Sequence, residues 1–490
     1  MSLTAPHHHA ERGRARRADV LAGLPGPAAA GVWQASLEAA FAVDGRRIVV
    51  LDDDPTGTQT VHNVPVVTRW RVEDLRWVLT RESRVAYVLT NTRSLDEAEA
   101  TAVNCEVVAN LLVAADAEGV PVSVVSRGDS TLRGHFAAET SAIIETLGAG
   151  GQRVDGVIFC PSYLEAGRVT VGDEHWIVED DWLRPVADSH YATDATFSFS
   201  TSHLPTYVEE VTGGGIRAQD VLSIGLDDIR SGGPDRIAAL LRELSDGRVA
   251  VVNALDATDL DAVVLAVLQV EAEGRHFLYR TGPSFVRARG GISERTPLRG
   301  EEIYPGGPRS GHGLVVVGSH VALTTLQVTT LQDSGDVERV ELDVRSLLDP
   351  AEADRAVQAA VRQVLSALER RDVLLVTSRE LVTGGDGQES LAIARAVSEA
   401  LVTTVNQVVR ARSPRYLLAK GGITSSDVFT HGLSGSRAKV LGSLLPGMVS
   451  VWQAEDGIDV GLPYVVFAGN VGGGDDLLAA VRILNGDTSC

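Results

Sequence analysis

Short apolar runs rich in Val, Ile and Leu alternate with longer Ala-rich stretches along most of this chain. The strand candidates of the first half lie at 47–51, 85–89, 120–126, 156–160 and 248–253. Residues 95–119, between two of these runs, carry apolar residues at helical spacing. Strands that alternate with helices are typical of βαβ units around a mainly parallel sheet. The sequence therefore predicts an α/β fold.

The length of 490 residues exceeds what one hydrophobic core usually supports, so two domains are expected. A stretch rich in Gly, Pro and charged residues, 294–313, is typical of a linker. Beyond it, strand candidates at 314–319, 372–378, 415–420 and 464–470 alternate with helical patterns at 350–369 and 388–411. We predict two domains, each a mainly parallel sheet flanked by helices, with a cleft between them. The predicted boundaries are a flexible segment 1–30, a first domain 31–293, the linker 294–313 and a second domain 314–490.

Charge and composition exclude several classes of protein. The chain has 44 Lys and Arg residues against 65 Asp and Glu residues, a net charge of −21, which disfavours binding to nucleic acid. No apolar run approaches the roughly 20 residues that span a bilayer, so no membrane association is predicted. Three widely spaced cysteines fit neither a disulfide framework nor a zinc site. The Arg-rich N-terminus, with His7, His8 and His9, lacks the apolar core of a secretory signal, and a cytoplasmic location is predicted.

Three consecutive carboxylates, Asp52, Asp53 and Asp54, follow the first apolar strand and precede Thr56 and Gly57. Such a cluster requires a cationic partner, because adjacent carboxylates repel one another. At the end of a strand, carboxylates can bind a hydroxylated ligand, take a proton from an alcohol or hold Mg²⁺. A helix N-cap with additional acids is the alternative.

Three further strand ends combine arginine with hydroxyl groups. The segment 126–135 is the densest, and two arginines beside hydroxyls suit the carboxylate of a small acid, which guanidinium groups bind with two parallel hydrogen bonds. As alternatives, Asp129 could cap a helix while its arginines face solvent, and Glu165 with Arg168 could form a structural salt bridge. The predicted substrate-binding residues here are Asn91, Arg93, Arg127, Asp129, Ser130, Thr131, Glu165 and Arg168.

Strand ends in the second half carry Gly, Ser and Thr instead of acids. Lysine occurs only at Lys420 and Lys439, and the P-loop pattern is absent, so phosphate binding would depend on backbone amides, arginine or one of these lysines. Glycine turns before helices allow close approach of a phosphate to a helix N-terminus. Ordinary strand-to-helix turns are the alternative. The candidate phosphate-binding residues are Ser319, Ser378, Lys420, Gly421, Gly422, Thr424, Ser425, Gly469, Asn470, Gly472 and Gly473.

Five motifs in a fixed order, from about residue 46 to about 482, resemble the four-carbon acid sugar kinase family: DDPTGT, DSTLRG, PSYLEAGR, GGITSSDV and GNVGGGDDL. The resemblance implies a sugar-acid-binding N-terminal domain and a nucleotide-binding C-terminal domain. It also implies ATP-dependent phosphorylation, with Mg²⁺, of a hydroxyl on a small, four-carbon acid such as threonate or erythronate. The family further suggests a homodimer. The partners expected are thus the acid and ATP.

Residues of this chain match the motifs of the family position by position. Asp53, Asp54, Thr56 and Gly57 match the Asp-Asp-x-Thr-Gly motif, and residues 129–134 match Asp-Ser-Thr-Leu-Arg-Gly. Members of the family often have alanine where Asp52 stands, aspartate where Thr60 stands and glutamate where Ile423 stands. These departures suggest a subgroup and leave the identity of its acid open.

Phosphoryl transfer requires positioning and charge neutralisation. Asp53 or Asp54 is the predicted base, and the sequence does not separate them. Arg127 and Arg133 are expected to hold the carboxylate of the acid, and contact of one of the two with the transferring phosphate is the alternative. Asp52, Thr56 and Gly57 are predicted to contact substrate, and the metal ligands stay unassigned.

Two other classes of protein share parts of this layout. A nicotinamide-dependent sugar-acid oxidoreductase would share the α/β layout, but the dinucleotide motif GxGxxG followed by an acidic residue is absent. A non-catalytic sugar-acid sensor would also have two lobes around a polar cleft. Such a sensor would need no phosphate-binding loops. The glycine turns near 421 and 472 predict such loops and therefore argue against a sensor.

Overall fold

The structure, a computed structural model, describes residues 13–307, 309–349, 351–378 and 387–487. The triplet His7–His9 and Cys490 lie outside these residues. The chain forms two compact units whose segments interleave along the sequence. Unit 1 comprises residues 1–46, 92–109 and 123–291, and unit 2 comprises 47–91, 110–122 and 292–490. The first acidic strand end therefore belongs to the same compact unit as the C-terminal third of the chain.

Unit 1 contains a run of parallel strands. Their order is β10 (Leu222–Ile224), β11 (Arg248–Val252), β6 (Gly156–Cys160), β12 (Phe277–Thr281) and β5 (Val122–Arg127). Every residue of β5, β6 and β12 is buried. Burial on both faces explains why these strands are continuous apolar runs without polar alternation. Their carboxyl ends present Arg127, Cys160 and Thr281 at one edge.

Helices of unit 1 follow its strands in sequence. They are α2 (Gln34–Val43), α5 (Phe136–Ala149), α6 (Leu204–Val211), α7 (Leu226–Arg230), α8 (Gly233–Arg242), α9 (Ala257–Ala272) and α10 (Pro283–Arg289). Helix α9 packs on α8, α2 and α10. Its start is fixed by a capping box: the Asp256 carboxylate accepts from Thr258 N at 2.9 Å, and that of Asp259 accepts from Asp256 N at 3.0 Å.

A small antiparallel sheet also belongs to unit 1. Its order is β1 (Ala15–Arg16), β9 (Trp182–Pro185), β8 (Glu174–Glu179) and β7 (Arg168–Val171). Strand β1 and helix α1 (Arg17–Leu21) lie within the segment predicted to be flexible. The pairing of Ala15 with Leu183 gives part of that segment regular structure. The sequence patterns had not indicated this sheet.

Unit 2 has a longer, mixed series of strands. The order is β2 (Arg47–Asp52), β4 (Val85–Leu89), β3 (Val64–Val67), β17 (Arg437–Leu445), β18 (Val449–Ala454), β19 (Pro463–Phe467), β16 (Leu417–Lys420), β13 (Leu314–Val317), β15 (Asp372–Thr377) and β14 (Val337–Leu342). Strands β17 and β18 are antiparallel to their neighbours, and the remaining pairs are parallel.

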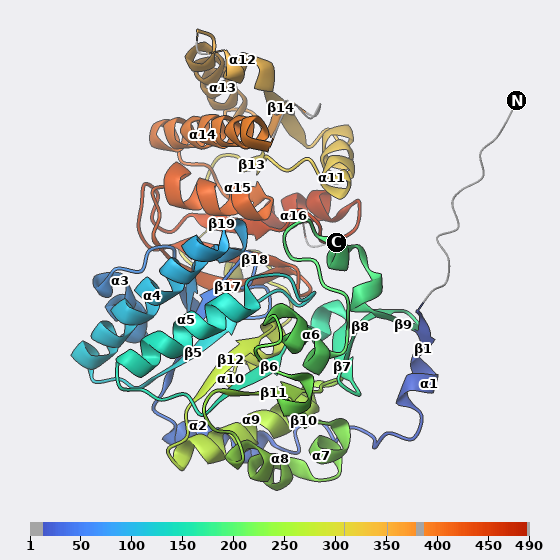
Figure 1. The fold of residues 1–490 in the computed structure, drawn as a ribbon. Helices are drawn as coiled ribbons and strands as arrows, with labels where there is room; N and C mark the ends of the chain where they lie inside the picture. The colour runs from blue at the N-terminus through green and yellow to red at the C-terminus, as the bar shows by residue number, and fades with distance from the viewer. Residues whose placement is uncertain (1–12, 308, 350, 379–386, 488–490) are drawn as a thin grey trace, which may run out of the picture. The chain divides into compact units, whose positions relative to one another are not determined.

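The helices of unit 2 alternate with its strands along the sequence. They are α3 (Val72–Leu79), α11 (Ala322–Asp333), α12 (Val344–Leu348), α13 (Ala353–Ala367), α14 (Gly387–Ala411), α15 (Gly422–Asp427) and α16 (Asp476–Leu484). Helices α11 and α16 lie side by side (Figure 1) and pack on Val315, Val317 and Leu374. Leu298 and Ile303, from the segment predicted as a linker, are buried in the same core.

Helix α4 (Glu97–Glu118) is long and apolar enough, by length and composition, to cross a membrane. An internal core helix of a globular protein meets the same criterion, and 39% of the most apolar window of α4 is buried inside the protein. Its residues are divided between the two units. The expectation that no apolar stretch approaches this length holds only for uninterrupted runs, since Glu99, Asn104 and Glu106 interrupt the helix.

The predicted α/β class is confirmed by the observed sheets and flanking helices. The hairpin β17–β18 had not been predicted. Its strand β17 contains Arg437, Lys439 and Gly442, and the register shifts between Val440 and Gly442. A polar, bulged strand has no regular apolar period to reveal it.

Candidate functional site

Asp52 ends strand β2 and is fully buried. Its Oδ1 accepts a hydrogen bond from Asp54 N at 3.3 Å. A Cβ atom at Gly57 would lie 1.8 Å from Asp52 Oδ2, so any side chain at this position would collide with the carboxylate. Asp52 and Gly57, both predicted to contact substrate, thus pack against each other and shape the turn.

Asp54 is half-buried, in contrast to Asp52 and Asp53. Its Oδ1 accepts from Thr56 N at 2.8 Å and from the Thr56 hydroxyl. On the other side of the carboxylate, a Cβ atom built on Gly422 would lie 3.7 Å from Asp54 Oδ2. The carboxylate therefore reaches the first turn of α15, the helix that follows the Gly421–Gly422 turn.

Asn91 reaches the same short helix. Its Nδ2 donates to Ser426 Oγ at 2.6 Å. The acidic turn is also anchored beyond Gly57, where the Thr58 hydroxyl donates to Ser450 Oγ at 2.9 Å and accepts from Trp452 Nε1 at 3.0 Å. Two predicted substrate segments, 52–57 and Asn91, are thus packed within unit 2 against a predicted nucleotide segment.

Asp129 is the charged centre of the second cluster, in unit 1. Burial opposes its ionisation, but the nearby guanidinium groups of Arg93 and Arg133, with hydrogen bonds from Thr131 and Arg133, lower the pKa of Asp129 well below its usual value. The Arg133 Nε atom lies 2.6 Å from Asp129 Oδ2. Asp129 is therefore a carboxylate at neutral pH and gathers two arginines around it.

The Arg133 guanidinium has two further neighbours. Its Cζ lies 4.9 Å from the centre of the Tyr191 ring, and its Nη1 lies 3.6 Å from Asp194 Oδ2. The backbone beneath it is fixed by Tyr207, whose hydroxyl donates to the Leu132 carbonyl at 2.7 Å. The motif scan identified Arg133 but not these contacts.

His175 fixes the carbonyl of Ser130 from below. Its Nε2 lies 2.8 Å from Ser130 O and therefore carries the proton, while Nδ1 accepts from the Thr170 hydroxyl at 2.9 Å. Burial lowers the pKa of His175 to about 4. The ring is neutral at physiological pH and holds the segment without adding charge. A lone histidine in a β-strand gave no signal in the sequence.

The third cluster contains Arg127, Tyr163, Glu165 and Arg168. Burial, followed by the charge of Glu165, raises the pKa of the Tyr163 hydroxyl, although Arg127 and Arg168 oppose this shift. Glu165 accepts from Arg287 Nε at 3.1 Å and from the Ser284 hydroxyl. The salt bridge considered between Glu165 and Arg168 is thus replaced by one to Arg287, and Arg168 donates to the Ala166 carbonyl.

Gly421 follows strand β16 with a φ of +117°, a backbone conformation that favours glycine. A Cβ atom there would lie 3.3 Å from Ser319 Cβ and from Thr424 Oγ1. A Cβ atom at Gly469 would lie 3.1 Å from Ser319 Oγ. The structure therefore brings together Ser319, Gly421, Thr424 and Gly469 at the carboxyl ends of adjacent strands, as the sequence predicts.

The second glycine turn, 469–473, is held by side chains that the motif scan missed. Thr324 Oγ1 donates to the Gly469 carbonyl at 2.8 Å, and Gln327 Nε2 donates to the Gly473 carbonyl at 2.7 Å. Asp476 Oδ2 accepts from Gly473 N at 2.7 Å. Two residues of α11 thus bind the outward carbonyls of the turn.

Lys420 is fully buried at the end of β16. Its Nζ donates to the Ala468 carbonyl at 2.5 Å and lies 3.9 Å from the centre of the Phe467 ring. Burial lowers the pKa of Lys420 to about 7, although the charge of Asp476 opposes this shift. Lys420, which was predicted to contact phosphate, is therefore hydrogen-bonded to the backbone at the end of the neighbouring strand.

The hydroxyls of Ser378 and Ser425, also predicted to bind nucleotide, have backbone partners. Ser378 Oγ accepts from Val344 N at 2.9 Å, at the start of α12. Ser425 Oγ donates to the Ala419 carbonyl at 2.9 Å. Both hydroxyls connect secondary-structure elements in the structure.

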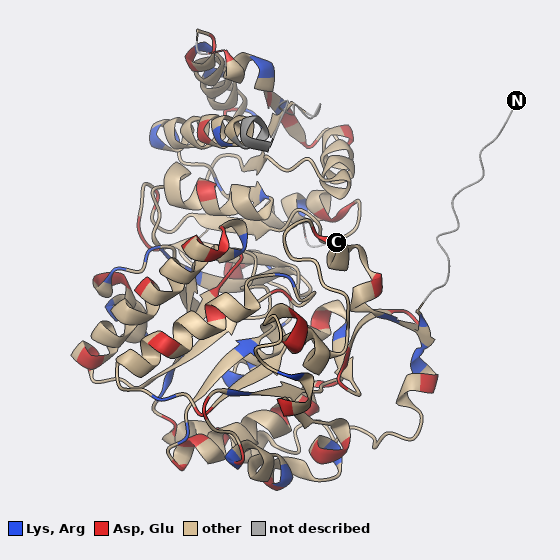
Figure 2. Ribbon diagram, in the orientation of Figure 1, with Lys and Arg blue, Asp and Glu red and all other residues tan. Residues whose placement is uncertain are grey.

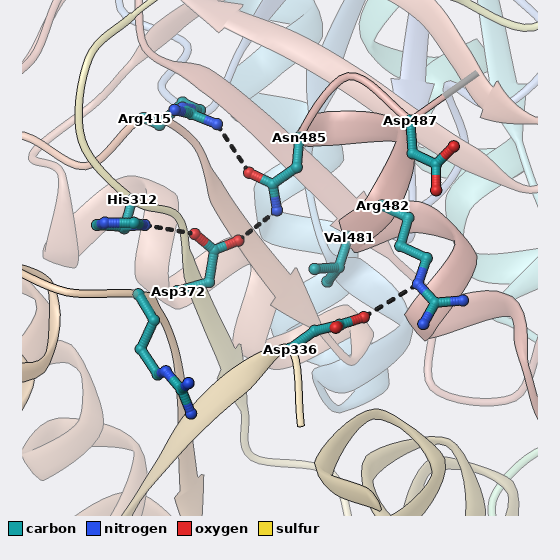
Figure 3. A pocket seen from close by; sticks show the side chains of 9 residues that line it. His312, Asp336, Asp372, Arg415, Val481, Arg482, Asn485 and Asp487 are labelled. Atoms are coloured by element: carbon teal, nitrogen blue, oxygen red, sulfur yellow. Dashed lines mark hydrogen bonds and ion pairs between the residues drawn. The ribbon is translucent and has the colours of Figure 1, made fainter. Parts of the chain in front are cut away.

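A cavity of about 450 Å³ lies at the amino ends of β13, β15 and β16, the sheet edge opposite to the glycine turns (Figure 3). Asn485 Nδ2 donates to Asp372 at 2.6 Å, and Arg415 donates to Asn485 at 2.9 Å. Arg482 pairs with Asp336 at 3.0 Å. Three aspartates balance the three arginines that line this cavity, so we do not assign the predicted site to it.

Along the described helices, acidic and basic positions are interspersed (Figure 2). Among the described residues, no group of three or more His, Cys, Asp or Glu side chains could hold a metal ion. Mg²⁺ in nucleotide enzymes is held largely by substrate phosphates and one or two carboxylates, which the turn at Asp54 or Asp476 could supply.

Comparisons with known proteins identify two family models along this chain. A family model described as a sugar-binding N-terminal domain matches residues 48–289, and one described as a nucleotide-binding C-terminal domain matches residues 314–477. A D-threonate kinase of Bordetella bronchiseptica is 27% identical over 82% of this chain and 87% of that protein. A D-erythronate kinase of Heliobacterium modesticaldum is 28% identical over 57% of this chain and 58% of that protein.

Two solved structures share the fold. A Salmonella typhimurium protein described as a putative tRNA synthase aligns with a TM-score of 0.66 and 18% identity, over 89% of this chain and 98% of that chain. A Haemophilus influenzae protein aligns with a TM-score of 0.59 and 16% identity, over 89% and 99%. At these identities the alignments establish the architecture alone.

Proposed function

Because the chain belongs to the four-carbon acid sugar kinase family, we propose that it transfers the γ-phosphoryl group of Mg·ATP to a hydroxyl of a small, four-carbon sugar acid. Threonate and erythronate are the first candidates, since a D-threonate kinase and a D-erythronate kinase are similar in sequence to this chain. The reaction would take place in the cytoplasm. Mg²⁺ enters this proposal as part of the nucleotide substrate.

The observation that carries the proposal is the position of Asp54 beside the first turn of α15. A Cβ atom on Gly422 would lie 3.7 Å from Asp54 Oδ2, so a carboxylate stands where a helix N-terminus offers amides to a phosphate. A base next to a phosphate-binding turn is what transfer to an alcohol requires. The Asp52 carboxylate packs against Gly57, and Asp53 is buried. Asp54 is therefore the favoured base.

In the proposed reaction, Asp54 orients the acceptor hydroxyl and accepts its proton. The acceptor oxygen forms a bond to the γ-phosphorus, and the bond between that phosphorus and the β–γ bridging oxygen breaks, which releases ADP. Backbone amides of the turns at 421–424 and 469–473 would hold the phosphates. Transfer would therefore depend mainly on positioning and charge neutralisation.

The acid would be held by the side chains of unit 1. Arg127 and Arg133 would bind its carboxylate, because guanidinium groups pair with carboxylates through two parallel hydrogen bonds. Asp129 remains charged and would accept hydrogen bonds from hydroxyls of the acid. Arg93 and Arg168 would complete the site. Their charges lie close enough to affect the pKa of Asp129 and of Tyr163, respectively.

The test is an assay of ADP release from the purified chain with Mg·ATP and a panel of tetronates and related sugar acids. We expect one acid to support turnover. Thermal-shift measurements with each ligand alone would accompany the assay, because a ligand of the native state raises Tm by mass action. Stabilisation by an acid but by no nucleotide would overturn the kinase proposal and favour a sugar-acid sensor.

Asp54→Asn should lower kcat by about hundredfold or more, because the base is lost while both binding regions remain. The KM values for acid and ATP should change little. Asp53→Asn is the matched control at the neighbouring buried carboxylate. If Asp53→Asn abolished turnover and Asp54→Asn did not, the base would be Asp53.

A further inference from the structure

We propose that Glu139 and Arg280 are positioning residues that together hold two acid-binding segments, residues 91–94 and 127–133, at a fixed spacing. Neither residue belongs to the motifs that identify the family. The name acid-binding rests on the proposed function, whereas the positioning role rests on the contacts below.

The two side chains form a buried ion pair. Arg280 lies on β12 and is 4% exposed, and Glu139 lies on α5 and is 2% exposed. Arg280 Nη1 donates to Glu139 Oε2 and, at 2.7 Å, to the Ser126 hydroxyl. Ser126 immediately precedes Arg127, so the pair is attached to the end of strand β5.

The same pair contacts both acid-binding segments. The Thr92 hydroxyl donates to Glu139 Oε1 at 2.5 Å, next to Arg93 in the first segment. In the second segment, a Cβ atom at Gly128 would lie 2.7 Å from Arg280 Cζ and 2.8 Å from Nη2. The guanidinium group thus fills the space beneath Gly128, whose neighbours are Arg127 and Asp129.

This arrangement controls a distance that matters for the proposed ligand. Arg93 and Asp129 lie in different segments, yet the charge of Arg93 acts directly on Asp129. One oxygen of Glu139 fixes the segment of Arg93, and the other, through Arg280, fixes the segment of Asp129. A change at Glu139 would therefore alter the spacing of two groups that it does not touch.

Unit 1 offers a matched control on the other face of β12. Arg289 Nη2 donates to Glu271 Oε2 at 2.6 Å, and the Tyr279 hydroxyl donates to Glu271 Oε1 at 2.5 Å. Arg289 and Glu271 are also buried. Tyr279 and Arg280 are consecutive strand residues and point to opposite faces. The control pair thus has the same chemistry without contact to either acid-binding segment.

The experiment compares Glu139→Gln with Glu271→Gln in the full chain. Each change keeps the shape but replaces an acceptor oxygen with an amide donor that must face an arginine or a hydroxyl. We expect both variants to lower Tm, since a buried arginine loses a carboxylate partner, although Arg289 keeps Asp44 at 3.2 Å. Only Glu139→Gln should raise KM for the acid, by about tenfold to hundredfold, while KM for ATP stays unchanged.

Amide hydrogen exchange supplies a readout that needs no substrate. Glu139→Gln should accelerate exchange in residues 91–94 and 127–133, and Glu271→Gln should leave these peptides unchanged. Thr92→Val, which removes one hydrogen bond and no charge, replaces Glu139→Gln if that variant does not fold. It should accelerate exchange in 91–94 alone.

The outcomes separate the two proposals. Equal effects of both Gln variants on exchange in the two segments would overturn the positioning role, even if the wild-type protein phosphorylates an acid. Selective loosening by Glu139→Gln in a protein that phosphorylates no acid would support the positioning role and overturn the proposed function.

Discussion

The two sets of predicted binding residues are supported in different ways. In unit 1, charged side chains in or next to the segments predicted to bind the acid are held by other charged side chains, as in Asp129 with Arg133 and Glu139 with Arg280. In unit 2, the glycine turns are held through their carbonyls by Thr324, Gln327 and Lys420. A ligand bound by backbone amides leaves the carbonyls of the turn to be satisfied from behind. The supporting contacts therefore fit the predicted modes of binding, by side chains in unit 1 and by backbone amides in unit 2.

Gly472→Ala should have the largest effect on the nucleotide side of this comparison. The φ of Gly472 is +86°, and an added Cβ atom would lie 2.4 Å from Asp476 Oδ2. Either the turn or the Asp476 carboxylate that accepts from Gly473 N must shift, and we expect KM for ATP to rise by about hundredfold with little change in KM for the acid. Steady-state kinetics with each substrate varied would test this. A matched substitution is Gly486→Ala, where φ is +91° and open space surrounds the position; equal effects would contradict the role of the turn.

Arg133→Ala tests the acid side. The loss of a charge-assisted hydrogen bond costs roughly 1.5–3 kcal/mol, so KM for the acid should rise by about tenfold or more. KM for ATP should stay constant. Lower kcat at unchanged KM for the acid would instead assign Arg133 to the transferring phosphate.

For Lys420 we predict a smaller, pH-dependent contribution to the stability of the fold. Burial lowers its pKa from 10.5 to about 7, so the folded protein binds this proton less tightly than the unfolded chain does. The contribution of Lys420 to the free energy of unfolding should therefore rise as the pH increases from about 7 toward 10.5.

Urea unfolding of wild type and Lys420→Met at several pH values would reveal this slope as a difference between the two proteins. Lys439→Met, at the other lysine of the chain, is the control because Lys439 is only partly buried. A pH-independent difference between wild type and Lys420→Met would show that Lys420 keeps an ordinary pKa.

Ser378→Ala should have the smallest effect. Its hydroxyl is engaged by Val344 N and Asp343, so we expect KM for ATP to change by no more than about twofold. Ser319→Ala, in contact with the turns at Gly421 and Gly469, is the comparison. A larger effect at Ser378 than at Ser319 would reverse our assignment of the nucleotide site.

The sequence predicted what local patterns encode. Buried strands such as β2 and β16 are mainly apolar runs, and residues predicted to have a chemical function lie just beyond them, as Asp54 and Gly421 do. The supports were not predicted, because they join distant segments: Arg280 meets Glu139 across 141 positions, and Thr324 meets Gly469 across 145. Nothing in the residues near Glu139 distinguishes it from other glutamates of amphipathic helices. The antiparallel hairpin and the interleaved units escaped prediction for the same reason.

The interleaving of the two units constrains how the chain can be divided and made. Strand β17 pairs with β3 through Arg437–Val67 and Val440–Val64, so a fragment that begins at residue 314 would expose this edge of β17 to solvent. An unpaired strand edge is a template for aggregation. During synthesis, β3 emerges about 370 residues before its partner, and it must stay unpaired on that edge until the last part of unit 2 has been made.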